Sequence, residues 1–73
     1  MSIGSKIRDL CKENGMSQAA LARAVYISKD AMYGYTNERC YPNAEVLHSI
    51  AQLFGVPMEY FWKEEEEGEQ YGD

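Results

Sequence analysis

Apolar residues recur at helical spacing along most of the chain, and no stretch alternates apolar and polar residues as a half-buried strand would. The first segment has apolar residues at i, i+4, i+7 and i+8, namely Ile3, Ile7, Leu10 and Cys11. Each such segment is short and is bounded by residues that start or stop helices. The spacing therefore predicts an all-α fold of five short helices.

Residues that favour helix ends mark the boundaries of these segments. Ser17, Ser28 and Asn43 are typical N-caps, because their side-chain oxygens accept a hydrogen bond from a free amide in the first turn. Gly15 and Gly55 follow the first and fourth segments, where glycine can adopt the left-handed conformation that ends a helix. The first predicted helix carries the apolar stripe of residues 3–11 and ends at residues 14–15. The others cover about 18–25, about 29–37 and 44–54, with a short fifth that begins at residues 56–57.

The chain of 73 residues is long enough for one small domain and too short for a deep enzymatic cleft. Its formal net charge of −5 is concentrated at the C-terminal end. Residues 1–62 contain six bases and six acids, whereas residues 63–73 contain one base and six acids. We therefore divide the chain into a neutral helical domain, residues 1–62, and an acidic tail, residues 63–73, which we expect to be disordered because it has few apolar side chains.

Several classes of protein are excluded by features that the sequence lacks. No apolar run approaches the roughly 18 residues of a membrane span, and the first residues do not form a signal peptide. Cys11, Cys40 and His48 are too few and too far apart to predict a metal site or a disulfide scaffold. No Ser/His/Asp set or phosphate-binding loop is present. We therefore expect a reduced cytoplasmic protein that is not an enzyme and uses no cofactor or metal.

The segment from Gln18 to Tyr35 is the most informative, because two short helices there are joined by only a few residues. Such a pair forms either an antiparallel hairpin or a steep crossing. Ala22 favours the crossing, since its methyl group lets a second helix approach closely, and Leu21 and Met32 can then share one apolar cluster. A helix supported in this way presents its opposite face outward, and the major groove of DNA admits one such helix.

Two motifs in this register resemble those of the Cro/repressor family of helix-turn-helix regulators, also called the XRE family. They are Ser-Gln-x-x-Leu-Ala at residues 17–22 and Ile-Ala-x-x-Phe-Gly-Val at residues 50–56, and the resemblance extends over roughly residues 7–62. It implies a compact lambda-repressor-like domain whose second and third helices form the helix-turn-helix. It also implies a sequence-specific transcriptional regulator, repressor-like, that binds double-stranded DNA. With so few cations in one subunit, we expect weak binding by a monomer, which points to a homodimer on a palindromic operator.

The resemblance also implies roles for individual residues. Gln18 matches the family position that contacts a DNA phosphate. Ser28, Lys29 and Asp30 match the exposed first turn of the recognition helix, which faces base edges. Lys29 could donate to guanine and Asp30 could accept from cytosine, although either could equally be a solvated surface charge.

Further candidates follow along the chain. Tyr33 and Gly34 lie farther along the same exposed face of that helix, and Tyr33 could be an exposed aromatic or touch a sugar or a thymine methyl group. The loop implied to run along the DNA backbone contributes the remaining candidates: Asn37, Arg39, Tyr41 and Asn43.

The sequence departs from the family pattern at three points. Tyr26 occupies a turn position where the family usually has glycine, so the turn is either strained or reshaped. Gly34 stands where many relatives carry a base-reading polar side chain, so it either allows close approach of the backbone or reads nothing. In addition, residues 1–62 have no excess of positive charge, which nucleic-acid binders usually show.

The large residues of the fifth segment are a candidate dimer surface, because four of them in five positions exceed what one short helix can bury: Met58, Tyr60, Phe61 and Trp62. The alternative is that Phe61 and one neighbour close the core while Trp62 covers its edge. A second function also remains open. The scaffold could serve as a protein-interaction module, antirepressor-like or antitoxin-like, that meets a protein partner through the acidic tail and binds DNA weakly or not at all.

Overall fold

The structure is a computed structural model that describes residues 2–62, so the predicted acidic tail, residues 63–73, lies outside the described residues. Its helical elements, in chain order, are α1 (Ile3–Glu13), α2 (Gln18–Ala24), α3 (Lys29–Thr36), α4 (Ala44–Phe54) and the 3-10 turn η1 (Met58–Phe61). No strand occurs within residues 2–62, so the all-α prediction is confirmed there. None of these helices is both long and apolar enough to cross a membrane.

The helices α2, α3 and α4 begin where the sequence predicts. Ser17, Ser28 and Asn43 cap α2, α3 and α4, and each side-chain oxygen accepts a hydrogen bond of 2.9 to 3.0 Å from the amide three residues on. Ser2 caps α1 in the same way at 3.1 Å. Gly55 ends α4 with a φ of 71°, in the left-handed region. Local hydrogen bonding therefore determines the boundaries of these helices.

The predicted fifth helix is a single 3-10 turn of four residues, so the count of five helices is not confirmed. Pro57 does not open this turn but precedes it in an extended conformation, with φ −73° and ψ 157°. The hydrogen bonds from Tyr60 N to Pro57 O and from Trp62 N to Glu59 O, both 3.0 Å, span three residues rather than four. The turn ends where Phe61 enters the core with 2% of its surface exposed.

One apolar core joins all the elements. Each of the four α-helices contributes one residue with no exposed surface: Ile7, Leu21, Met32 and Ile50. The other buried apolar residues are Leu10, Cys11, Ala22, Leu47, Ala51 and Phe61. In a domain this small the core is marginal, so the removal of any one of these side chains is expected to weaken the whole fold.

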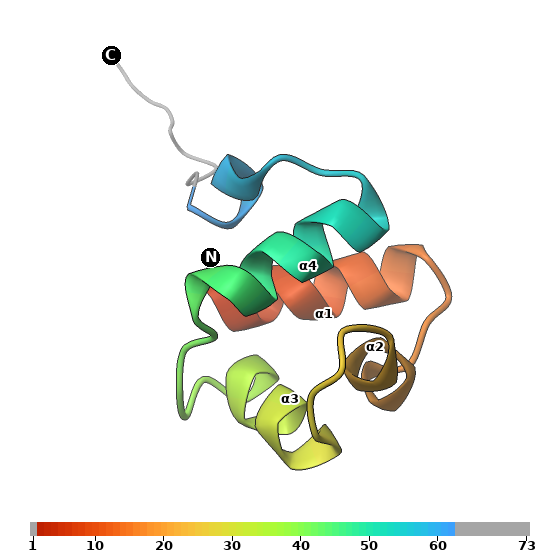
Figure 1. Ribbon diagram of the computed structural model, residues 1–73, viewed down its shortest axis with the longest axis vertical. Helices are drawn as coiled ribbons and strands as arrows, with labels where there is room; N and C mark the ends of the chain where they lie inside the picture. The colour runs from red at the N-terminus through yellow and green to blue at the C-terminus, as the bar shows by residue number, and fades with distance from the viewer. Residues whose placement is uncertain (1, 63–73) are drawn as a thin grey trace.

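The crossing of α2 and α3 has the steep geometry that the sequence predicts. Figure 1 shows α2 nearly end-on while α3 runs across the view, with both below α1 and α4. Ala22 of α2 is 1% exposed, and Leu21 and Met32 are buried with it in the shared core. The inner faces of α2 and α3 are thus buried by their packing against each other and the core. The outer face of α3 remains available for contacts with other molecules.

A glycine allows α1 to pack closely against the end of α3. Gly4 is buried, and a Cβ atom at this position would collide with the backbone carbonyl oxygen of Tyr35. Gly34, also buried, has only the Cys40 sulfur above it, 2.9 Å from where a Cβ would be. A Cβ at Gly4 would meet backbone, whereas a Cβ at Gly34 would meet only the end of an exposed side chain. Alanine is therefore easier to accommodate at Gly34 than at Gly4.

The turn between α2 and α3 keeps the left-handed conformation despite its tyrosine. Tyr26 has a φ of 63°, and Glu38, after α3, has a φ of 64°. Tyr26 is 93% exposed, so few contacts compensate for this conformation. Of the two alternatives for Tyr26, the structure shows the strained turn, which costs on the order of 1–2 kcal/mol for a residue other than glycine.

We expect Gly4→Ala to destabilise the domain by about 1–3 kcal/mol, because the added methyl group forces α1 away from α3. Gly34→Ala is the matched control. It should change stability by less than about 1 kcal/mol, since the Cys40 side chain can turn away and alanine favours the helix. Urea denaturation followed by far-ultraviolet circular dichroism measures both. Equal losses for the two variants would contradict the packing described here.

Replacing Tyr26 with glycine should stabilise the domain by about 1 kcal/mol, because glycine adopts a positive φ without steric cost. For a domain of this size that corresponds to a rise of about 4–8 °C in the midpoint of thermal unfolding. Tyr33→Gly, inside α3, should have the opposite sign and cost about 1 kcal/mol. A Tyr26→Gly variant that is less stable than the parent would show that the tyrosine ring contributes contacts.

Candidate nucleic-acid interface

The outer face of α3 begins with three exposed residues, as the sequence predicts. Ser28, Lys29 and Asp30 are all exposed at the start of the helix, and Tyr33, 38% exposed, follows one turn later. The Ser28 hydroxyl accepts a 3.0 Å hydrogen bond from the Ala31 amide. Ser28 therefore also fixes where α3 begins, and its neighbours form a short exposed row.

The loop after α3 brings the remaining polar candidates to the surface. Asn37, Arg39 and Tyr41 are exposed, Tyr41 by 82%. Asn43 is exposed as well; its side-chain oxygen accepts from the Val46 amide, which leaves both donors of its amide nitrogen for another partner. These side chains follow one another along the segment between α3 and α4.

Gly34 does not belong to the exposed row, contrary to the expectation that it lies on the outer face. It is buried, and its carbonyl oxygen accepts a 2.9 Å hydrogen bond from the Arg39 amide. The absence of a side chain there admits Cys40 and the returning loop. The atom nearest to a Cβ at this glycine is the Cys40 sulfur, so the structure shows close approach of a side chain there and not of backbone.

Gln18 lies in a group of polar residues that the sequence does not reveal. Gln18 is half-buried, and its Oε1 accepts a 2.7 Å hydrogen bond from the hydroxyl of Thr36, the last residue of α3. Arg8 of α1 donates from its guanidinium to the Thr36 carbonyl oxygen. Sequence reasoning missed Arg8 and Thr36, because Arg8 flanks the apolar stripe of α1 just as Lys12 does and only packing decides which one meets α3.

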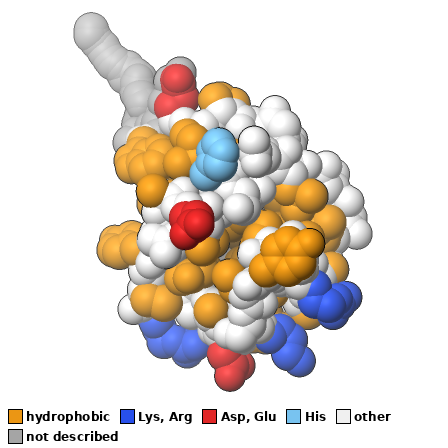
Figure 2. All heavy atoms as spheres, in the orientation of Figure 1, with side chains coloured by type: hydrophobic (Ala, Val, Ile, Leu, Met, Phe, Trp, Pro, Cys, Tyr) orange, Lys and Arg blue, Asp and Glu red, His pale blue; other side chains and the backbone are white. Residues whose placement is uncertain are grey.

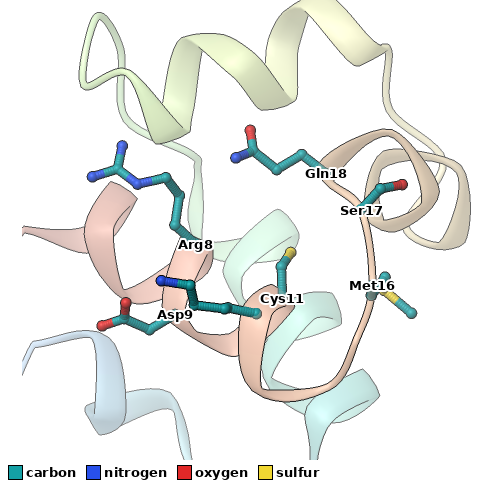
Figure 3. A pocket seen from close by; sticks show the side chains of 7 residues that line it. Arg8, Asp9, Cys11, Met16, Ser17 and Gln18 are labelled. Atoms are coloured by element: carbon teal, nitrogen blue, oxygen red, sulfur yellow. The ribbon is translucent and has the colours of Figure 1, made fainter.

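A surface hollow of about 340 Å³ adjoins this group, between α1 and the start of α2 (Figure 3). Its lining consists of Arg8, Asp9, Cys11, Lys12, Met16, Ser17 and Gln18. Burial raises the pKa of the Cys11 thiol, so this side chain contributes a neutral group at physiological pH. Arg8 and Lys12 outnumber the single acid, Asp9, which makes the lining of the hollow net positive.

Positive charge is local rather than general. Figure 2 shows Lys and Arg side chains gathered along the lower edge of the molecule, on the side that α2 and α3 form in Figure 1, with one acidic group among them. Exposed cations in this part of the chain are Arg23, Lys29 and Arg39. Within residues 2–62, no cluster of three or more His, Cys, Asp or Glu side chains could hold a metal ion.

The candidate dimer residues divide into a buried and an exposed part. Phe61 is in the core, and Met58 and Tyr60 are half-buried against it. Lys6 donates a 2.8 Å hydrogen bond to the Tyr60 carbonyl oxygen and lies 5.2 Å from the centre of its ring, which ties the turn to α1. Only Trp62, 54% exposed, is largely free of the domain. The expectation that Phe61 lies on a partner surface is therefore corrected, because its ring closes the core.

The sequence of residues 6–59 matches the Cro/C1-type helix-turn-helix DNA-binding domain. The chain belongs to this family. The resemblance seen in the two sequence motifs is thereby confirmed, and the family comprises DNA-binding proteins rather than enzymes, in agreement with the prediction that this chain is not an enzyme.

Relatives of known sequence and structure agree with the family assignment. The cryptic phage CTXphi transcriptional repressor RstR of Vibrio cholerae is 32% identical over 54 residues, which are 74% of this chain and 49% of that protein. The chain thus spans about half the length of this curated relative.

Two solved structures of the P22 c2 repressor share the fold. One is a crystal structure in complex with the synthetic operator 9T, with a TM-score of 0.77 and 26% identity over 84% of this chain and 92% of that one. The other is a solution structure of the DNA-binding domain of that repressor, residues 1–76, with a TM-score of 0.80 and 27% identity over 86% of this chain and 83% of that one.

Proposed function

We propose that this chain is a sequence-specific DNA-binding transcriptional regulator, repressor-like, which inserts α3 into the major groove as a homodimer. The observation that carries the proposal is the exposed first turn of α3, supported from behind by the buried side chains of Leu21 and Met32. Membership of the Cro/C1-type family supports it, as does the likeness to a repressor bound to its operator.

Base recognition is assigned to the exposed row of α3. Lys29 donates to the O6 and N7 acceptors of guanine, and Asp30 accepts from the amino group of cytosine. Tyr33, one turn farther along, contacts a sugar or a thymine methyl group. With Gly34 buried, only three side chains after the Ser28 cap remain for direct contacts to bases.

Contacts to the DNA backbone are assigned to Gln18 and to the loop after α3. Gln18 donates to a phosphate through its amide nitrogen, because its oxygen is already bonded to Thr36. The loop side chains that accompany it are Asn37, Arg39, Tyr41 and Asn43. Few of these groups are cations, so we expect a shallow dependence of affinity on salt and weak binding by one subunit.

Pairing of two subunits compensates for the small contact set of one. A homodimer places two recognition helices about one turn of DNA apart, which matches a palindromic operator. Trp62 supplies the exposed aromatic surface for this pairing, with the half-buried Met58 and Tyr60 beside it. Phe61 contributes only by holding the turn in place.

One observation favours a second candidate function. Asp30 places a carboxylate in the groove-facing turn of α3, and the six bases of residues 1–62 are balanced by six acids. A scaffold of this kind could bind a protein partner, with the acidic residues 63–73 taking part, and bind DNA weakly or not at all. A stoichiometric complex with a protein and no DNA binding would favour this alternative.

Selection from a pool of random duplexes tests the proposed function directly. We expect an enriched palindrome at low salt, with two half-sites about 10 base pairs apart from centre to centre. The full chain should bind the selected duplex as a dimer in sedimentation experiments. A pool without any enriched sequence would contradict the proposal.

Two alanine substitutions separate base recognition from backbone contact. Lys29→Ala should relax the preference at one base pair or cost about 1–3 kcal/mol of specific binding. Gln18→Ala should weaken selected and unrelated duplexes alike, since a phosphate carries no sequence information. Titration of both duplexes measures these effects. Lys12→Ala, which removes the same charge from α1, should leave the base preference unchanged.

A further inference from the structure

We propose that Arg8 and Gln18 form a seat for one phosphate of the DNA backbone, and that Thr36 is the positioning residue that holds both side chains in it. The inference rests on the proposed function and deepens it. It adds a cation of α1 and a buried hydroxyl of α3 to the residues that act on the backbone.

Three helices meet at Thr36 through polar contacts. Thr36 is 1% exposed, its hydroxyl donates to Gln18 Oε1 at 2.7 Å, and its carbonyl oxygen accepts from the Arg8 guanidinium. In Figure 3 the side chains of Arg8 and Gln18 extend from α1 and α2 toward α3, and the nitrogen end of the Gln18 amide is on the side of Arg8. One residue therefore aligns two side chains that are ten positions apart in the sequence.

The hydroxyl of Thr36 determines which end of the Gln18 amide is presented. An amide carries two donors on its nitrogen and an acceptor on its oxygen, whereas a phosphate oxygen only accepts. Because Thr36 donates to the oxygen, Nε2 is the end that remains for a phosphate. Without the hydroxyl the amide could turn and present its oxygen, which a phosphate repels.

Arg8 supplies the positive charge of the seat. It is exposed, and one of its donors is bonded to Thr36 while a second makes a long contact of 3.5 Å with the Ser5 hydroxyl. A guanidinium has five donors, so three remain, and their planar arrangement suits the oxygens of a phosphate. The bond to Thr36 restricts the side chain beforehand, which lowers the entropy that binding would otherwise remove.

The position of the seat fits a backbone contact. It borders the positive lining of the hollow between α1 and α2, to which Lys12 also belongs. Thr36 ends the helix whose first turn is assigned to the bases. A phosphate bound by Arg8 and Gln18 would therefore be fixed relative to α3 through Thr36, and the depth and angle of α3 in the groove would depend on this contact.

A double-mutant cycle tests the role of Thr36. Thr36→Val removes the hydroxyl and keeps the shape of the side chain, and we expect it to weaken binding to selected and unrelated duplexes about fivefold. In a Gln18→Ala background the same substitution should have no further effect, because Thr36 acts through Gln18. Thr36→Ser, which keeps the hydroxyl, should restore most of the affinity.

Two results of this cycle would overturn the inference. One is a Thr36→Val variant that binds as tightly as the parent. The other is an equal loss in the parent and in the Gln18→Ala background, which would show that Thr36 only supports the packing of α3. Circular dichroism and thermal unfolding confirm that each variant is folded, and Gln52→Ala on the exposed side of α4 is the matched control for Gln18→Ala.

The salt dependence of binding tests the role of Arg8. Arg8→Gln should reduce the slope of log K against log salt by about 1, because one contact between a cation and a phosphate is lost. Arg8→Lys should keep the slope, and Gln18→Ala should keep it as well, since glutamine is neutral. An unchanged slope for Arg8→Gln would remove Arg8 from the seat.

Nuclear magnetic resonance of the free protein separates this inference from the proposed function. The side-chain amide signals of Gln18 should be shifted by the hydrogen bond from Thr36, and in Thr36→Val they should move toward those of the exposed Gln52. Signals that do not move would overturn the positioning role even if DNA binding is established. Conversely, Gln18→Ala that leaves the affinity for DNA unchanged would contradict the backbone contact, whatever the signals show.

Discussion

The close crossing of α2 over α3 is the constraint on which the rest of the structure depends. It depends on a small residue and large apolar residues that pack together in the core, and Ala22, Leu21 and Met32 are all buried there. Because the inner side of α3 is buried by this packing, its first turn must face outward. The candidate interface is therefore a consequence of how the core is filled, and a larger side chain at Ala22 would disturb α3 before it changed any exposed residue.

Glycine and non-glycine residues are distributed in an unusual way around this crossing. Gly4 and Gly34 are used where backbone or a side chain comes too close for a Cβ atom. The two left-handed positions at the ends of the crossing helices are occupied by Tyr26 and Glu38 instead. A domain of this size has little stability to spare, so the strain at these positions is a substantial fraction of the total. Stabilisation must come mainly from the core.

The uneven distribution of charge along the chain explains how a chain with a negative net charge can belong to a DNA-binding family. The net charge of −5 lies in residues 63–73, while residues 1–62 are neutral. Interactions between exposed charges are screened beyond about 8 Å at physiological salt, so a DNA surface responds to the few cations near it. Lys29 is exposed at the start of α3, and Arg39 is exposed in the loop that follows this helix. Arg8 lies at the end of α3, where it donates to the Thr36 carbonyl oxygen. If Gln18 contacts the DNA backbone as proposed, such neutral donors take a correspondingly larger share of the backbone contacts.

The sequence by itself determined the starts of α2, α3 and α4, the apolar faces of the helices and, through two motifs, the family. Ser17, Ser28 and Asn43 act on amides three residues away, so these boundaries depend on neighbours along the chain and can be predicted from them. The tertiary structure decided the rest, because it depends on contacts between residues that are far apart in sequence. It turned Gly34 inward beneath Cys40, drew Phe61 into the core and brought Arg8 and Gln18 together at Thr36. A helical pattern shows which side of a helix is apolar, but only the packing of the other helices shows which polar residues at its edge will meet.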